Sequence, residues 1–313
     1  MPHNEIVYLV FGMVLVIALV ADLGLMSKKG KVVTMQSAIY LTLFWVLLAF
    51  AFFVFMWMEE GHKKAIEYIS AYLMEWSLSI DNIFVFILIF NAFKIKEVFY
   101  SRVLLIGILM AIVFRVVFIT VGVGLVEQFH WVLYIFGAFL VYTGFKMFTE
   151  HERKEFSPKE NKIYRFLQKF LPLTSSDGNG RFIIRVNNKP QYTILFVTVV
   201  MLASVDLIFA LDSIPAVMGI SQDRIIIYTS NIFAVMGLRA MFFLLAGIID
   251  KFYLLQKGLS LILLFIGAKM LLEIVSYEIS PTVSFTVIIV TLTLSIIFSV
   301  IIPRKGEQSI ADE

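Results

Sequence analysis

The sequence predicts an all-α protein that crosses a membrane many times. Hydrophobic residues make up 60% of the chain, and its mean hydropathy is +0.91. Apolar runs of about 18–25 residues, each long enough to cross a hydrocarbon core of about 30 Å, follow one another along nearly the whole length. A soluble domain of 313 residues has no need of so many long apolar runs, so we expect a polytopic membrane protein.

The apolar runs predict nine transmembrane helices. They cover residues 5–27, 35–58, 68–92, 102–124, 130–149, 192–219, 225–249, 254–277 and 282–302. The first run has no basic region before it and is followed by Lys28, Lys29 and Lys31, which is the reverse of a signal peptide. It is therefore predicted to be retained as a span.

The basic residues of the loops predict the orientation. Most lysines and arginines between the runs fall in alternate loops, whereas the opposite loops hold only Lys63, Lys64 and Arg224. Because basic loops stay on the cytoplasmic side, we expect the N-terminus outside and the C-terminus in the cytoplasm. The net charge of +3 therefore reflects topology, and no nucleic-acid partner is expected.

The one long connection, residues 150–191, is predicted to be cytoplasmic. Its apolar residues within 163–171 recur at i, i+3, i+4, i+7 and i+8, which predicts an amphipathic helix lying on anionic membrane lipid. A turn at 177–180 and a short strand near 182–184 are expected to follow. No pattern typical of catalysis occurs here, so we expect a packing or regulatory role.

Two residue types restrict the chemistry. The chain has no cysteine, which excludes disulfides, thiolate metal sites and thiol nucleophiles. Its four histidines lie in loops or at the ends of runs, which argues against a histidine ligand or base inside the membrane. We do not expect an enzyme.

Four acidic residues lie inside apolar runs, six positions apart in each of two pairs: Glu75 with Asp81, and Asp206 with Asp212. A charge at the centre of a membrane helix costs about 2.5–3.5 kcal/mol, and such residues face a bundle interior or a watery cavity. Positions six apart lie about 120° from each other around a straight helix, so each helix either unwinds there or presents its two acids to different neighbours. We expect Asp81 and Asp212 to contact a ligand directly, with Glu75 and Asp206 as a second layer or relay.

An internal repeat surrounds these acids. Arg115 and Arg239 follow the two acidic pairs in the same order, and Gly144–Met147 is answered by Gly267–Met270. Three helices repeated in tandem insert upside down the second time, which predicts inverted repeats with a site near the midplane at their interface. The predicted organisation is two helices in 1–67, a first unit in 68–149, the loop 150–191, a second unit in 192–277, and a last helix and tail in 278–313.

Pro215 lies inside the sixth run, where it cannot donate a hydrogen bond to the carbonyl of Leu211. We expect the helix to break there, and the freed carbonyl beside Asp212 is a candidate cation ligand. A simple proline kink is the alternative, because membrane helices tolerate proline when neighbours satisfy the backbone.

The candidate site offers only oxygen ligands, because Asn82 and Ser213 adjoin the central aspartates. Oxygens suit hard cations such as Mn²⁺, Ca²⁺ and Mg²⁺ over Zn²⁺ or Cu⁺. The predicted metal-binding residues are Glu75, Asp81, Asn82, Asp206, Asp212 and Ser213. Arg115, Arg239 and Lys269 are expected to compensate the acids when no cation is bound, with protons as a candidate coupling ion. The prediction is a transporter whose cation is substrate, at the interface of the repeats.

Other functions fit parts of this pattern. The charged groups would also serve as buried ion pairs that hold helices together. An intramembrane aspartyl protease needs two carboxyls that share a proton, but neither aspartate lies in a Gly-x-Gly-Asp sequence. A cation/proton antiporter for Ca²⁺ or another cation, and a membrane scaffold in metal or tellurite stress without transport, stay open.

The acidic segments carry a resemblance to a known family. Residues 75–82, 206–217 and 230–240 resemble the TerC family of integral membrane proteins, and the nine-span layout resembles its Alx-like branch. The likeness covers roughly residues 70–275, with a modest departure at Val217–Gly219. It implies residence in the bacterial inner membrane and export of Mn²⁺, with family roles in metal supply to exported enzymes and tellurite resistance. The family's intramembrane acids would correspond to Glu75, Asp81, Asp206 and Asp212.

Overall fold

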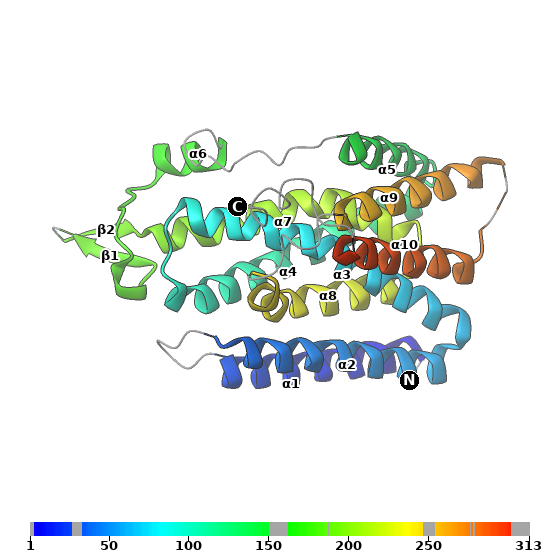
Figure 1. The fold of residues 1–313 in the computed structure, drawn as a ribbon, viewed down its shortest axis with the longest axis horizontal. Helices are drawn as coiled ribbons and strands as arrows, with labels where there is room; N and C mark the ends of the chain where they lie inside the picture. The colour runs from blue at the N-terminus through cyan, green and yellow to red at the C-terminus, as the bar shows by residue number, and fades with distance from the viewer. Residues whose placement is uncertain are drawn as a thin grey trace, which may run out of the picture.

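A computed structural model describes residues 3–26, 33–149, 162–186, 188–246, 254–275, 277 and 279–301. Within these ranges the side chains of residues 3–5, 21–26, 80, 81, 84 and 162 lie outside the description. The described chain is a bundle of long helices lying side by side (Figure 1). The long helices are α1 His3–Met26, α2 Met35–Glu60, α3 His62–Ala92, α4 Glu97–Gln128, α5 Val132–Thr149, α7 Ile194–Met218, α8 Arg224–Leu245, α9 Leu255–Leu272 and α10 Pro281–Ile301.

The predicted class, an all-α protein with many membrane spans, is confirmed. Seven helices in the described residues are long and apolar enough to cross a membrane, namely α2, α4, α5, α7, α8, α9 and α10. The helices α1 and α3 coincide with the two remaining apolar runs, but α1 has only a shorter apolar stretch, Ile6–Val20, and α3 carries several charges. The count of nine spans therefore stays a prediction.

Helix boundaries follow local capping chemistry more closely than hydropathy. The Thr34 hydroxyl accepts from the amide of Ser37 at the start of α2, and the Asp223 carboxylate accepts from the amide of Ile225 at 2.9 Å at the start of α8. Between α2 and α3 the chain turns at Gly61, whose φ of 88° favours glycine. Because nothing interrupts the helix after Gly61, α3 begins at His62, earlier than the apolar run at 68.

The core of the bundle is formed by α3, α4, α7 and α8. Helix α3 packs against α7 and α8, and α4 packs against the same two helices, while α5 packs along α9. Helix α2 covers α3 and α8, and α10 covers α3 and α9. This set of core contacts is unchanged when α3, α4 and α5 are exchanged for α7, α8 and α9, as a two-fold relation would require. The inverted repeat itself stays a prediction.

The outer faces of the covering helices are apolar. Large side chains such as Ile17, Leu47, Phe145 and Val300 are more than half exposed, as expected of lipid-facing positions. In contrast, α8 lies in the interior, with every residue from Thr229 to Phe242 buried. Buried polar groups therefore gather where α8 meets its neighbours.

The long connection forms a small subdomain at one end of the bundle (Figure 1). It holds the short helix α6 Lys162–Phe170, then β1 Ile183–Val186 paired antiparallel with β2 Lys189–Tyr192, with Ile183 opposite Tyr192. Lys96 reaches Asp177 at 2.6 Å, and Arg102 donates to the carbonyl of Gly180 at 2.6 Å. These contacts fix the subdomain to the start of α4. Residues 150–161 of the predicted loop lie outside the described residues.

Candidate functional site

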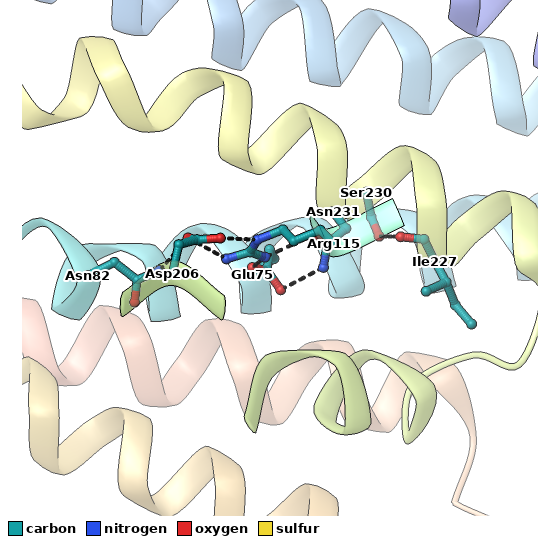
Figure 2. A network of polar contacts seen from close by, with 7 residues as sticks. All are labelled: Glu75, Asn82, Arg115, Asp206, Ile227, Ser230 and Asn231. Atoms are coloured by element: carbon teal, nitrogen blue, oxygen red, sulfur yellow. Dashed lines mark hydrogen bonds and ion pairs between the residues drawn. The ribbon is translucent and has the colours of Figure 1, made fainter. Parts of the chain in front are cut away.

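The guanidinium of Arg115 is the centre of a buried polar network between four helices (Figure 2). Its Nε donates to Asp206 Oδ2 at 2.8 Å and its Nη2 to Asp206 Oδ1 at 2.9 Å, a two-point pairing between α4 and α7. Its Nη1 donates to Glu75 Oε1 on α3 and to Asn231 Oδ1 on α8, the latter at 2.9 Å. One cation therefore joins two carboxylates that come from different predicted repeats.

Asn231 closes the network from α8. Its Nδ2 donates to Glu75 Oε2 at 3.0 Å while its Oδ1 accepts from Arg115. Asn231 is fully buried, so both ends of its amide group need partners inside the protein. The amide thereby fixes the orientation of the Glu75 carboxylate relative to Arg115.

Helices α3 and α7 each carry an acid and a neutral polar residue, and the acid of one helix lies opposite the neutral residue of the other. On α3, Asn82 lies seven positions after Glu75, and on α7 Ser213 lies seven positions after Asp206, so each pair shares one helix face. Asn82 Nδ2 donates to Asp206 Oδ1 at 3.3 Å. The Ser213 hydroxyl lies beside the Glu75 carboxylate, outside the geometry of an ordinary hydrogen bond. Because α3 and α7 run in opposite directions, the acid of each helix faces the neutral polar residue of the other (Figure 1).

The side chains of the network are almost completely buried, and two polar oxygens near it have no hydrogen-bond partner. The exposed fraction of Glu75, Asn82, Arg115 and Asp206 is 2% or less. Two oxygens on α3, Asn82 Oδ1 and Ser79 Oγ, are buried without a hydrogen-bond partner. An unpartnered buried oxygen costs about 1–3 kcal/mol, so both atoms have the capacity to accept a hydrogen bond or bind a cation.

The remaining acids take different positions. Asp212 lies on a half-buried face of α7, where Oδ1 accepts from the Thr143 hydroxyl of α5 at 3.3 Å. The side chain of Asp81 lies outside the described residues. The expected arrangement, with Asp81 and Asp212 in the centre and Glu75 and Asp206 behind them, remains untested. What the structure brings together is Glu75, Asn82, Asp206 and Ser213, with Asp212 apart.

The predicted compensating cations are also divided. Arg115 lies within the acidic network, whereas Arg239, buried on α8, donates to the Ser101 hydroxyl of α4 at 2.6 Å. Lys269 is buried on α9. Sequence reasoning assigned no site role to Asn231 or Ser79, although a polar residue in the middle of an apolar run is the signal that would have found both.

The expected break at Pro215 does not occur. Helix α7 continues from Ile194 to Met218 with Pro215 inside it, and the amide of Gly219 donates to the Pro215 carbonyl at 2.9 Å. Helix α3 likewise continues through the span between Glu75 and Asp81. The proline therefore removes one hydrogen bond without unwinding the helix.

Among the described residues, no group of three or more Asp, Glu, His or Cys side chains is arranged to hold a metal ion. The carboxylates of Glu75 and Asp206 both lie near the network centre, and Arg115 pairs with each of them. Ionised, this trio carries one net negative charge. A cation that entered would compete with the guanidinium for the same carboxylate oxygens.

Comparison with known proteins identifies relatives along nearly the whole chain. The family model for the integral membrane protein TerC family matches residues 60–307. The uncharacterized membrane protein STKORF319 of Myxococcus xanthus is 40% identical over 299 residues, which cover 95% of this chain and 93% of that protein. A membrane protein of Rickettsia felis is also 40% identical, over 94% of this chain and 96% of the relative.

A third relative carries a more specific name. A protein of Escherichia coli strain K12 is 39% identical over 298 residues, covering 92% of each chain, and its name includes the words "membrane-bound redox modulator Alx". No solved structure matches this chain.

Proposed function

Because this chain belongs to the TerC family of integral membrane proteins, we propose that it exports a divalent cation, with Mn²⁺ as the first candidate. The observation that carries the proposal is the Arg115 network, in which two carboxylates from two core helices converge on one buried guanidinium. Charged groups inside a membrane protein are costly and typically mark ion pathways. The export direction and the choice of Mn²⁺ come from the family resemblance.

The donor chemistry of the network suits a hard cation. Glu75 and Asp206 supply carboxylate oxygens, and the unpartnered Asn82 Oδ1 and Ser79 Oγ supply neutral ones. Mn²⁺, Ca²⁺ and Mg²⁺ accept all of these oxygens. A divalent cation would exceed the single negative charge of the trio, so its entry favours departure of Arg115 from at least one carboxylate or participation of Asp212.

Arg115 would then act as a built-in counter-ion. When the cation leaves, the guanidinium returns to Asp206 and Glu75, so the acids never stay buried without a partner. Exchange of the cation for Arg115 or for protons makes movement between two states of the bundle electrostatically feasible. In transporters with inverted repeats, such sites alternate between the two sides of the membrane.

The name of the Escherichia coli relative raises a second role, because it refers to redox modulation. This chain has no cysteine, so its own residues cannot perform thiol–disulfide exchange. We propose that any redox effect of this chain is indirect, through the level of a redox-active cation such as manganese.

The test measures intracellular manganese and calcium by elemental analysis in cells that express the wild type, Asp206→Asn or Glu127→Gln at matched membrane abundance. Glu127 is the control because it is an exposed carboxylate that pairs with Arg224. It lies near the end of α4, several turns after Arg115. We expect the wild type and Glu127→Gln to lower manganese and Asp206→Asn to fail. If Asp206→Asn exports as well as the wild type, the network is structural; if the wild type changes no metal, the transport proposal is wrong.

A further inference from the structure

A second buried acid lies on α3, eight residues before Glu75 and so about 12 Å from it along the helix axis. Glu67 is only 9% exposed, and its Oε2 accepts from the Ser221 hydroxyl at 2.6 Å. Ser221 belongs to the short connection between α7 and α8. The acid therefore lies at the end of the bundle that is predicted to face outside.

Lys269 lies on α9, which also contacts α3. Its side chain is only 6% exposed, and it lies within electrostatic range of Glu273 and Glu67. Within the described part of the chain, its ammonium makes no hydrogen bond and no ion pair within 4.0 Å. A lysine side chain held in the interior without a hydrogen bond or an ion pair is costly, which makes Lys269 a candidate for a role beyond packing.

The connection that carries Ser221 is itself held by charge. The amide of Asp223 donates to the Ser221 hydroxyl at 3.2 Å, and Asp223 Oδ2 pairs with Lys64 at 2.9 Å. Lys64 also reaches Glu60 at 2.7 Å. Glu67 is joined to this connection by the Ser221 hydroxyl, and a cation bound at Glu67 would replace that hydrogen bond.

We propose that Glu67, Ser221 and Lys269 form an outer gate, in which the Lys269 ammonium and a departing divalent cation compete for the Glu67 carboxylate. The carboxylate and the hydroxyl oxygen are ligands that a hard cation accepts. The Lys269 ammonium, within electrostatic range of Glu67, offsets the charge of that carboxylate after the cation leaves and repels cations that approach from outside. This inference rests on the proposed export of a divalent cation and assigns its exit step.

The first experiment measures Mn²⁺ flux into vesicles that contain purified full-length protein and a divalent-sensitive dye. The variants are Glu67→Gln, Lys269→Met and the double variant, with Glu127→Gln as the control at the same end of the bundle. We expect Glu67→Gln to lower the flux at least about fivefold, the low end for coupling between two sites. Lys269→Met should raise flux against the normal direction by a similar factor, and the double variant should behave like Glu67→Gln because the two residues act on one step.

The second experiment does not depend on transport. Because the chain has no cysteine, Ser221→Cys introduces a single thiol whose modification by a membrane-impermeant reagent can be timed on intact cells. We expect millimolar Mn²⁺ to slow this modification, also when Asp206→Asn is present. A thiol introduced at the exposed Phe129→Cys should show no effect of Mn²⁺.

The two experiments separate the possible failures. If the wild type moves Mn²⁺ but the gate variants match it and Mn²⁺ does not protect the Ser221→Cys thiol, the gate is wrong while the proposed function stands. If Mn²⁺ protects the thiol in a protein that moves no cation, the binding step of the gate is supported and the proposed function fails. An additive double variant would show that Glu67 and Lys269 act separately, which also overturns the gate.

Discussion

Arg115 on α4 holds Asp206 on α7 by two parallel hydrogen bonds, with Nε 2.8 Å from Oδ2 and Nη2 2.9 Å from Oδ1. A planar guanidinium makes this two-point contact, whereas an ammonium makes only a point contact. The contact links the two predicted repeats through buried charge.

The substitution Arg115→Lys should separate charge from geometry. Lysine keeps the positive charge but cannot reach Asp206, Glu75 and Asn231 together, so we expect lower thermal stability in detergent and lower metal export. Removing the charge in Arg115→Met should cost more, about 3–5 kcal/mol, because two buried carboxylates then lack a cation. Equal stability of Arg115→Lys and the wild type would show that the two-point contact of the guanidinium with Asp206 does not stabilise the protein.

Asn231→Leu tests the amide bridge. The substitution leaves Glu75 Oε2 and Arg115 Nη1 each with one partner fewer in a dry environment. We expect the free energy of unfolding to fall by about 1–3 kcal/mol, measured by denaturant unfolding in micelles. Asn91→Leu is the control, because Asn91 is exposed near the end of α3, and it should change stability little.

Asp212→Asn distinguishes transport from structure. Asp212 is half-buried and has one weak hydrogen bond to Thr143, so the neutral isostere should leave the melting temperature nearly unchanged. If Asp212 takes part in cation movement, the same variant should lose metal export. A stable variant with full export would remove Asp212 from the site, whereas an unstable one would show that its charge is structural.

Gly267→Ala tests the close approach of α5 and α9. A Cβ at Gly267 would lie 2.7 Å from the carbonyl oxygen of Gly137 and 2.8 Å from the amide nitrogen of Val141. Backbone atoms cannot move aside, so the helices must separate, at a cost of about 1–3 kcal/mol. Gly124→Ala is the matched control, since nothing lies within 4 Å of its added Cβ. Comparable melting temperatures for both variants would contradict this packing.

The contact between Lys96 and Asp177 predicts a pH effect at the subdomain. The hydrogen bond from Lys96, and then that from the amide of Asn179, lowers the pKa of Asp177 below its ordinary value. This contact therefore contributes its full stability above about pH 4, the pKa range of an unfolded aspartate, and loses it as the pH falls through the lower folded pKa. Hydrogen exchange of residues 174–186 should accelerate in acid, and Asp177→Asn should abolish that pH dependence.

Much of the fold follows from hydropathy, because a membrane helix must satisfy its backbone within its own segment. The apolar runs therefore locate the helices well. Their ends are less predictable: α4 begins at Glu97 and ends at Gln128, beyond the run 102–124, because helical hydrogen bonding continues into the polar boundary.

The site was less accessible to sequence reasoning. The spacing of acids along one helix gives their angular separation, but it does not tell which neighbouring helix each one faces. Glu75 and Asp206 share Arg115 directly, a contact that their spacing along the chain does not indicate. The packing of α3, α4, α7 and α8 determines that Arg115 pairs with both acids. The same packing places Asn231 within hydrogen-bond distance of Arg115 and Glu75.

Helix α7 carries Asp206 before Pro215 and is followed by Ser221 after it. Proline has no amide hydrogen, so the carbonyl of Leu211 lacks its helical donor although the helix continues. Bending at this point would cost less than bending elsewhere along α7, since no further backbone hydrogen bond has to be broken there. A small tilt of the last turns would shift the outer connection relative to the Arg115 network. One helix would thus link the state of the inner acids to that of Glu67 mechanically, without a chain of polar residues between them.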